Sequence, residues 1–379
     1  MQVICPDCRT TLLWSPVAWR CACGGALESA EEPFFDSASI DPKVRGLWRY
    51  SAFLPVPSDT QQISMGEGWT PLVDGEFESI SVRWKLEFLN PTGSFKDRGT
   101  APLMTALKSW GVQHVVEDSS GNAGASAAAY SARAGMKATI FVPAHASPSK
   151  LAQIGIYGGR VVSVPGPRVE ATRAAEAALT TEVAYASHVW QPTFLAGLQT
   201  LAWEIWEQLD GRAPEWLIAP VGQGTLLLGA YRGFRVLLEA GHIQRLPRMV
   251  AAQAERCAPL YAAWREGLDH VPSVQGSPTA AEGIRITCPV RGRELLQAIG
   301  ESGGAVLRAS EDQIRAAQSA LARRGLYVEP TSAVAVACLD QLRSRVGRDD
   351  VVVVPLTGSG LKGAPVDLQG DGRREQDDR

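Results

Sequence analysis

Short apolar segments alternate with helical segments along most of this chain, and this alternation restricts the fold more than any other feature of the sequence. We expect strands at 112–117, 138–142, 160–164, 216–219, 250–253 and 351–354. We expect helices at 123–135, 149–157, 169–179 and 226–241. Short apolar strands that alternate with helices are typical of an α/β protein whose sheets are mostly parallel.

Length and composition point to a globular protein of more than one domain. The chain has 379 residues, 45% hydrophobic and 20% charged, which is enough for two domains and a large core. The formal net charge is −3 and the basic residues are scattered, so we expect no nucleic-acid partner. No apolar run reaches the roughly 18 residues of a membrane-spanning helix. The N-terminus also lacks a signal-peptide pattern, and we therefore expect a cytoplasmic protein without a membrane partner.

Four of the seven cysteines lie within the first 23 residues. Cys5 and Cys8 form one pair, and Cys21 and Cys23 form a second pair after twelve intervening residues. This spacing is typical of a zinc ribbon, in which four thiolates hold a structural ion and leave no open position for chemistry. Only one residue separates the cysteines of the second pair, so a ribbon held by packing, with free thiols, is the alternative.

The segment 90–99 reads Asn-Pro-Thr-Gly-Ser-Phe-Lys-Asp-Arg-Gly and places Lys96 just after a Gly-Ser turn, where a helix is expected to begin. A lysine fixed there can form a Schiff base with an aldehyde cofactor; an ordinary solvated lysine is the alternative. The segment resembles the lysine motif of the threonine synthase branch of the fold-type-II pyridoxal-phosphate (PLP) enzymes. Residues 66–72, Gly-Glu-Gly-Trp-Thr-Pro-Leu, resemble a second segment of that family.

The resemblance runs from about residue 66 to residue 362 and implies a fold. It implies two parallel-sheet α/β domains, with ligand bound in the cleft at the carboxyl ends of the strands. A homodimer is the expectation of the family. The units that we expect are a zinc-ribbon-like segment at 1–30, an arm and the first part of the large PLP domain at 31–99, a small α/β domain at 100–205, the second part of the large domain at 206–366, and a disordered tail at 367–379.

A second motif, Asp-Ser-Ser-Gly-Asn-Ala-Gly at 118–124, follows a strand and opens a helix. Small residues at a helix start let backbone N–H groups point at an anion, whereas a plain N-cap loop is the alternative. The resemblance implies that Ser119, Ser120, Gly121 and Asn122 bind the substrate carboxylate. It also implies that the Asn122 side chain contacts the phenolic oxygen of the cofactor.

Two further turns follow strands of the expected larger sheet. Glycines in the first turn permit close backbone approach of a phosphate, and the resemblance assigns the cofactor phosphate to Gly222, Gln223, Gly224 and Thr225. The family more often has Asn at the position of Gln223. In the second turn the resemblance places Thr357 beside the pyridine nitrogen, although it also suits an ordinary turn. A neutral hydroxyl there fits elimination and replacement better than transamination.

Three more residues are weaker candidates for the site. The resemblance places Glu282 in a loop that often faces the cofactor ring, and a surface glutamate is the alternative. His188 and Gln191 could face the substrate cleft, or His188 could be a structural residue. Phe194 departs from the family, because threonine synthases carry there an arginine that binds the substrate phosphate. An aromatic ring cannot supply bidentate charged donors, so either another residue binds the phosphate or the substrate differs.

The sequence therefore predicts a PLP-dependent enzyme of amino-acid metabolism with a small-molecule substrate. Lys96 is expected to carry the cofactor and then to act as the base for the α-proton. The resemblance implies a carbon–oxygen lyase acting on phosphates, a threonine synthase that makes threonine and phosphate from O-phosphohomoserine and water. The alternatives are a serine or threonine dehydratase, a β-replacement enzyme such as a cysteate or cysteine synthase, and a non-catalytic PLP-binding regulatory protein.

Overall fold

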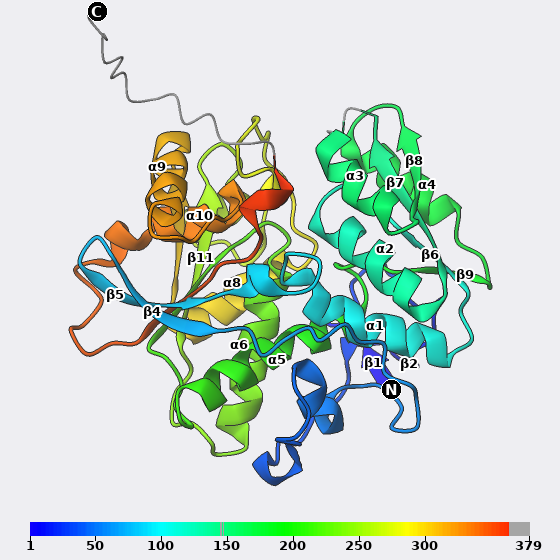
Figure 1. Ribbon diagram of the computed structural model, residues 1–379, viewed down its shortest axis with the longest axis horizontal. Helices are drawn as coiled ribbons and strands as arrows, with labels where there is room; N and C mark the ends of the chain where they lie inside the picture. Colours follow the sequence, from blue (N-terminus) through cyan, green and yellow to red (C-terminus); the bar gives the residue numbers. More distant parts are fainter. Residues whose placement is uncertain (145, 147, 364–379) are drawn as a thin grey trace, which may run out of the picture.

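The computed structural model describes residues 1–144, 146 and 148–363. Within these residues the strands form three sheets, of six, four and three strands (Figure 1). The predicted disordered tail at 367–379 lies outside the described residues. In the part of the chain that the structure describes, no helix is long and apolar enough to cross a membrane.

The six-stranded sheet, on the left in Figure 1, has the strand order β12-β11-β10-β13-β5-β4. All neighbouring strands are parallel except β4 and β5, which form an antiparallel hairpin. Central parallel strands are buried on both faces by helices, and each residue of β13 is buried. The strands are β4 (Leu72–Phe77), β5 (Ile80–Lys85), β10 (Trp216–Pro220), β11 (Arg248–Ala254), β12 (Ala305–Ala309) and β13 (Val352–Pro355).

The four-stranded sheet, on the right in Figure 1, has the order β8-β7-β6-β9, and all its neighbouring strands are parallel. Its strands are β6 (His114–Glu117), β7 (Lys137–Pro143), β8 (Arg160–Val164) and β9 (Val183–Tyr185). The helices in this part of the chain are α1 (Lys96–Ser109), α2 (Asn122–Ala134), α3 (Pro148–Ile156) and α4 (Arg168–Ala177).

The remaining helices follow the four-stranded sheet in the chain or are short 3-10 turns. The later α-helices are α5 (Pro192–Gln208), α6 (Thr225–Glu239), α7 (Pro259–Glu266), α8 (Gly292–Glu301), α9 (Glu311–Ala322) and α10 (Pro330–Ala337). The 3-10 turns are η1 (Ser37–Ser39), η2 (Leu47–Phe53), η3 (Glu87–Leu89), η4 (Glu282–Ile284), η5 (Leu339–Leu342) and η6 (Gly360–Lys362).

Helices α5 and α6 pack closely in the interior. A Cβ atom added at Gly229 of α6 would lie 2.5 Å from the Cβ of Leu198, and one added at Gly233 would lie 2.5 Å from the carbonyl oxygen of Gln199. The two glycines are four residues apart and therefore share one helix face. Every residue of α5 from 192 to 205 is buried, as expected of a helix in the core of a large protein.

The prediction of an α/β fold with parallel sheets is confirmed. Each expected strand and helix is present, and its ends agree with the structure to within two residues. The sequence pattern did not indicate the β4–β5 hairpin, β12 or α5. The domain boundaries at residues 30, 99, 205 and 366 stay a prediction.

Candidate active site

A cavity of about 250 Å³ lies between the carboxyl ends of strands from both parallel sheets. Its position is the one expected for the ligand of an open α/β sheet. The structure brings the predicted cofactor and substrate positions, with the exception of Gln191, to its wall, together with Glu282. They are Lys96, Ser119, Ser120, Gly121, Asn122, His188, Gly222, Gln223, Gly224, Thr225 and Thr357.

Lys96 is the first residue of α1 and lines the cavity. Its Nζ lies 4.6 Å from the centroid of the Phe95 ring and 5.8 Å from that of Phe194. Burial lowers the pKa of Lys96 to about 7, against the opposing charge of Glu117. A neutral amine is therefore well populated near pH 7, and this is the form that attacks an aldehyde.

The turn before Lys96 is held by hydrogen bonds to α1 and to the segment after β13, and Asp97 also binds α2. The buried carboxylate of Asp97 accepts hydrogen bonds from the Thr92 N–H at 2.7 Å, from the Thr92 hydroxyl at 2.6 Å and from the Ser126 hydroxyl at 2.7 Å. The Phe95 N–H donates to the Thr357 carbonyl at 3.0 Å, which ties the turn to the end of β13. These bonds fix the backbone from which the Lys96 side chain projects.

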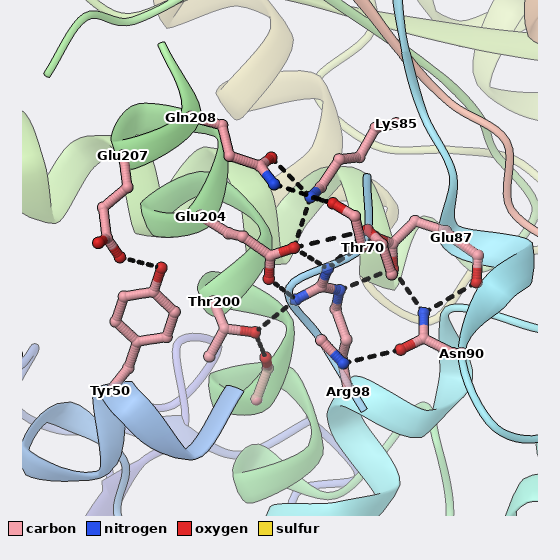
Figure 2. Close-up of polar contacts among 12 residues, drawn as sticks. Tyr50, Thr70, Lys85, Glu87, Asn90, Arg98, Thr200, Glu204, Glu207 and Gln208 are labelled. Atoms are coloured by element: carbon pink, nitrogen blue, oxygen red, sulfur yellow. Dashed lines mark hydrogen bonds and ion pairs between the residues drawn. The ribbon is translucent and has the colours of Figure 1, made fainter. Parts of the chain in front are cut away.

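Figure 2 shows a buried network of charges around Arg98, which is two residues after Lys96 in α1. Arg98 donates to Glu87 at 2.6 Å and to Glu204 at 2.6 Å, and Lys85 donates to Glu204 at 2.5 Å. The four side chains are fully buried, and their two positive and two negative charges balance. Burial alone would raise the pKa of Glu204, but the two cations outweigh it and lower that pKa to about 2. The network joins α1, β5 and α5.

The loop from Ser119 to Asn122 begins α2 at the carboxyl end of β6. Gly121 is the N-cap residue and no side chain caps the helix, so its first N–H groups are available to an anion. A Cβ atom at Gly124 would lie 1.9 Å from the Ser119 carbonyl oxygen, which explains the glycine. The Asn122 amide donates to the two carboxylate oxygens of Glu329 at 3.0 and 3.1 Å.

The turn before α6 has a similar form. Gly224 is the N-cap residue in a left-handed conformation, with φ of 75°, and no side chain caps α6. A Cβ atom at Gly222 would lie 2.8 Å from the Ile284 Cα. The side-chain oxygen of Gln223 accepts the Val290 N–H at 3.0 Å, which fixes the orientation of this side chain at the cavity wall.

Thr357 lies at the end of β13 and is 1% exposed. Its hydroxyl is 2.8 Å from the hydroxyl of Ser332 in α10, which also accepts the Gly358 N–H at 2.9 Å. This contact fixes the orientation of the Thr357 side chain at the cavity wall.

His188 lines the cavity and is bound from behind by Glu117. The His188 Nδ1 lies 2.6 Å from a Glu117 oxygen, and the other Glu117 oxygen accepts the Ser119 N–H. Burial raises the pKa of Glu117 to about 7. Burial and the charge of Lys96 lower the pKa of His188 well below its usual value. A neutral ring whose Nδ1–H donates to Glu117 follows from these shifts.

Gln191 lies elsewhere than the sequence suggested, whereas Phe194 lies beside the site. Gln191 does not belong to the described wall of the cavity, because its amide is used in the interior: it accepts from Trp14 Nε1 at 3.1 Å and donates to the Tyr185 carbonyl at 2.6 Å. Phe194 is 1% exposed, and its ring centroid is 6.2 Å from that of His188. An uncharged ring thus occupies the space beside Lys96.

The family described as "Pyridoxal-phosphate dependent enzyme" matches residues 63–358. The chain belongs to this family. It is 35% identical to a threonine synthase of Methanocaldococcus jannaschii over 94% of this chain and 92% of that protein. It is 34% identical to a threonine synthase of Methanosarcina acetivorans over 94% of this chain and 91% of that protein. This PLP-dependent enzyme therefore belongs to the threonine synthase-like branch, as predicted.

Solved structures agree with the fold of this PLP-dependent enzyme. A threonine deaminase from T.th. has a TM-score of 0.66 and 25% identity, and the match covers 78% of this chain and 94% of that one. Maize serine racemase has the same TM-score of 0.66 at 19% identity, over 77% of this chain and 88% of that one. The fold-type-II architecture is thus confirmed.

The residues of the cavity fit PLP. An aldehyde needs an amine, and Lys96 has no hydrogen-bond acceptor or carboxylate within bonding distance among the described residues. A phosphate needs close N–H groups, and the first N–H groups of α6 have no side-chain cap. A pyridine nitrogen needs one polar partner, which Thr357 supplies. The roles of the individual residues stay predictions.

The four N-terminal cysteines come together, and none of them belongs to the described wall of the cavity. Their sulfur atoms all lie within 4.8 Å of one another, in a segment whose strands β1 (Gln2–Ile4), β2 (Thr11–Leu13) and β3 (Glu28–Ser29) form an antiparallel sheet of order β2-β1-β3. A Cβ atom at Gly25 would lie 2.6 Å from the Cys5 sulfur, so only glycine fits. Four thiolates at this spacing suit zinc, and zinc itself stays a prediction.

The structure adds charged residues that the sequence analysis missed. Glu117, Arg168, Arg285 and Glu329 lie at or behind the cavity wall. Glu117 ends an apolar strand, and Glu329 precedes Pro330 at a helix start. A charged residue at the end of a buried strand or at a helix start is a sequence signal that could have indicated both glutamates. Nothing in the local sequence distinguishes Arg168 or Arg285 from surface arginines.

Proposed function

We propose that this chain is a threonine synthase, a PLP-dependent lyase that acts on the phosphate ester O-phosphohomoserine and forms threonine and inorganic phosphate. The observation that carries the proposal is the likeness to curated threonine synthases over more than nine-tenths of this chain and of theirs. The cavity supports it, because a lysine with no bonded partner among the described residues faces two uncapped helix starts there.

When bound, PLP withdraws electrons from the α carbon of an amino acid and so makes the loss of protons and of a γ substituent possible. Lys96 removes the α-proton at its Nζ, and its pKa near 7 lets the amine both take up and return a proton near neutral pH. The N–H groups from Ser120 to Asn122 orient the substrate carboxylate. The N–H groups of Gly222–Thr225 hold the phosphate of the cofactor.

The neutral His188 ring, held by Glu117, lines the cavity near the proposed substrate position. Glu117 holds the His188 Nδ1, so the imidazole keeps a fixed orientation and presents its other edge to the cavity. We assign His188 a substrate-contacting role. Thr357 offers only a hydroxyl, which keeps the cofactor ring a weaker electron acceptor than a carboxylate would.

A dehydratase or β-replacement activity is the second candidate, and Phe194 is the observation in its favour. An aromatic ring in place of a phosphate-binding arginine would not hinder a substrate that has no γ-phosphate. The T.th. protein with this fold is a threonine deaminase at 25% identity, which is a lower identity over a smaller share of this chain than the likeness to the threonine synthases.

The test is to supply the PLP-loaded protein with O-phosphohomoserine and to measure inorganic phosphate and threonine together. Equal release of both products supports threonine synthase, and Lys96→Ala must abolish it. Ammonia and a 2-oxo acid formed from L-serine or L-threonine, with no phosphate released from O-phosphohomoserine, would instead establish the dehydratase. Cysteine or cysteate formed from an O-activated serine and a sulfur nucleophile would establish the β-replacement enzyme.

A homodimer is also proposed, on the family expectation alone. Sedimentation of the PLP-loaded protein at several concentrations tests it, with a mass of about twice the 40.6 kDa of the chain expected.

A further inference from the structure

The substrate that we propose carries two anionic groups, the α-carboxylate and a γ-phosphate, and the Ser119–Asn122 loop accounts for only one of them. A phosphate in a protein site is best held by a guanidinium, which can donate two parallel hydrogen bonds. The resemblance to threonine synthases implies an arginine for this role at the position of Phe194, whose uncharged ring is buried beside Lys96 and His188. The phosphate must therefore be bound by a residue from another element.

The described wall of the cavity contains two arginines, Arg168 and Arg285. Arg285 follows η4, whose Ile284 packs against Gly222, so it lies on the side proposed for the cofactor phosphate. Arg168 begins α4 on the side of the four-stranded sheet, which also carries the loop from Ser119 to Asn122.

Helix α4 is fixed so that one face meets this loop. The Thr172 hydroxyl donates to the Asp118 carboxylate at 2.5 Å, directly before Ser119. Arg168 is four residues before Thr172, and residues at this spacing share a helix face. Ala171 and Ala175 are fully buried, which holds the helix against the sheet. The start of α4 therefore lies over the proposed substrate position.

The Arg168 side chain is available to a ligand. It has no hydrogen-bond acceptor or carboxylate within bonding distance in the described part of the chain. Its positive charge also reaches the interior of the site: it lowers the pKa of Lys96 and of His188, and it opposes the raised pKa of Glu117.

We propose that Arg168 binds the γ-phosphate of the substrate and so replaces, from α4, the arginine that is absent at Phe194. The inference rests on the proposed function and names the residue that selects the substrate class, an α-amino acid with an anionic side-chain leaving group. Arg168 acts in binding and takes no part in proton transfer.

The experiment compares Arg168→Gln, Arg168→Lys, Arg285→Gln and Arg173→Gln with the unchanged enzyme, all loaded with PLP. Arg173 is a matched control on the same helix, where its exposed side chain pairs with Glu170. For Arg168→Gln we expect KM for O-phosphohomoserine to rise about 10- to 100-fold, the loss expected for a charged hydrogen bond. The affinity for L-threonine, which lacks the phosphate, should change less than about twofold. The KM of Arg168→Lys for O-phosphohomoserine should lie between the values of the unchanged enzyme and of Arg168→Gln. Lysine keeps the positive charge but cannot donate the two parallel hydrogen bonds of a guanidinium.

The same variants are then titrated calorimetrically with 2-amino-5-phosphonopentanoate, an unreactive phosphonate of the same length. This measurement separates the two proposals, because it needs no turnover. If the unchanged enzyme releases no phosphate from O-phosphohomoserine, the proposed function fails, yet tenfold weaker phosphonate binding by Arg168→Gln still supports the role of Arg168. Three results would overturn the role of Arg168. The first is that Arg168→Gln binds the phosphonate as tightly as the unchanged enzyme, and the second is that only Arg285→Gln loses binding. The third is that the unchanged enzyme does not bind the phosphonate.

Discussion

The indole Nε1 of Trp14 donates a hydrogen bond to the side-chain oxygen of Gln191, at 3.1 Å and in the buried interior. Trp14 belongs to the cysteine-bearing N-terminal segment, whereas Gln191 precedes α5 and lies three residues after His188. The side-chain NH2 group of Gln191 donates a second hydrogen bond, to the Tyr185 carbonyl oxygen. The N-terminal segment is thereby joined to the segment that carries a wall residue of the active site.

Replacement of Trp14 by Phe should destabilise the protein by about 1–3 kcal/mol, because it leaves the Gln191 oxygen buried without a donor. Urea denaturation measures this change. Trp110→Phe is the control: Trp110 is exposed and packs edge-on against Trp14, and its replacement should cost less than about 0.5 kcal/mol. Equal stability of the two variants would show that the bond contributes nothing.

The purified protein should contain one zinc ion per chain, held by Cys5, Cys8, Cys21 and Cys23. Elemental analysis of the protein checks the stoichiometry. Cys8→Ser should lower the zinc content and the melting temperature, because structural zinc contributes to folding. Cys288→Ser, at an exposed cysteine outside the cluster, should change neither. Full stability with no bound metal would favour the packed ribbon with free thiols.

The capture of PLP by the cofactor-free protein should depend on pH with a midpoint near 7. The pKa of Lys96 is lowered by burial from 10.5 to about 7, so the reactive neutral amine is the minor form below pH 7 and the major form above it. The rate, followed by absorbance, should rise about tenfold per pH unit below the midpoint and level off above it. Lys96→Ala should show no capture, and Lys43→Ala, at an exposed lysine, should match the unchanged protein. A midpoint near 10 would contradict the effect of burial.

Glu204→Gln should destabilise the protein by about 3–5 kcal/mol, because Arg98 and Lys85 would keep two buried charges with only Glu87 to balance them. The folded-state pKa of Glu204 is depressed to about 2 from 4.5. Its contribution is therefore present above pH 4.5 and lost as pH falls toward 2. Urea denaturation should show a steeper acid decline for the unchanged protein than for the variant.

The control for Glu204→Gln is Glu239→Gln, which removes an exposed ion pair with Arg235 and should cost less than about 1 kcal/mol. A loss as small in Glu204→Gln as in the control would mean that the buried network adds little to stability.

Gly222→Ala should weaken PLP binding by tenfold or more. The added Cβ would lie 2.8 Å from the Ile284 Cα, a backbone atom that cannot move without shifting the turn. Gly300→Ala, in α8, meets no atom within 4 Å and is the matched control. Titration of the cofactor-free variants with PLP measures both dissociation constants. Unchanged affinity in Gly222→Ala would argue against this turn as the phosphate site.

Local patterns allowed much of the site to be predicted. Lys96 and Asn122 each begin a helix, Gly222 and Thr357 each lie in a turn after a strand, and the structure brings all four to one cavity. The alternation of strands and helices likewise predicted the parallel sheets. By contrast, α5 was not recognised, because a helix buried on most sides has no polar face to mark its period.

The sequence by itself determined the α/β class and the turns that can hold a lysine, a carboxylate and a phosphate, because these depend on residues close together in the chain. Tertiary structure alone decided which distant polar and charged groups meet: Asn122 with Glu329, Arg98 with Glu204, and Arg168 with the cavity. Such pairings depend on how the sheets and helices pack, since a charged side chain has the same local signal whether its partner is another residue, a substrate or water.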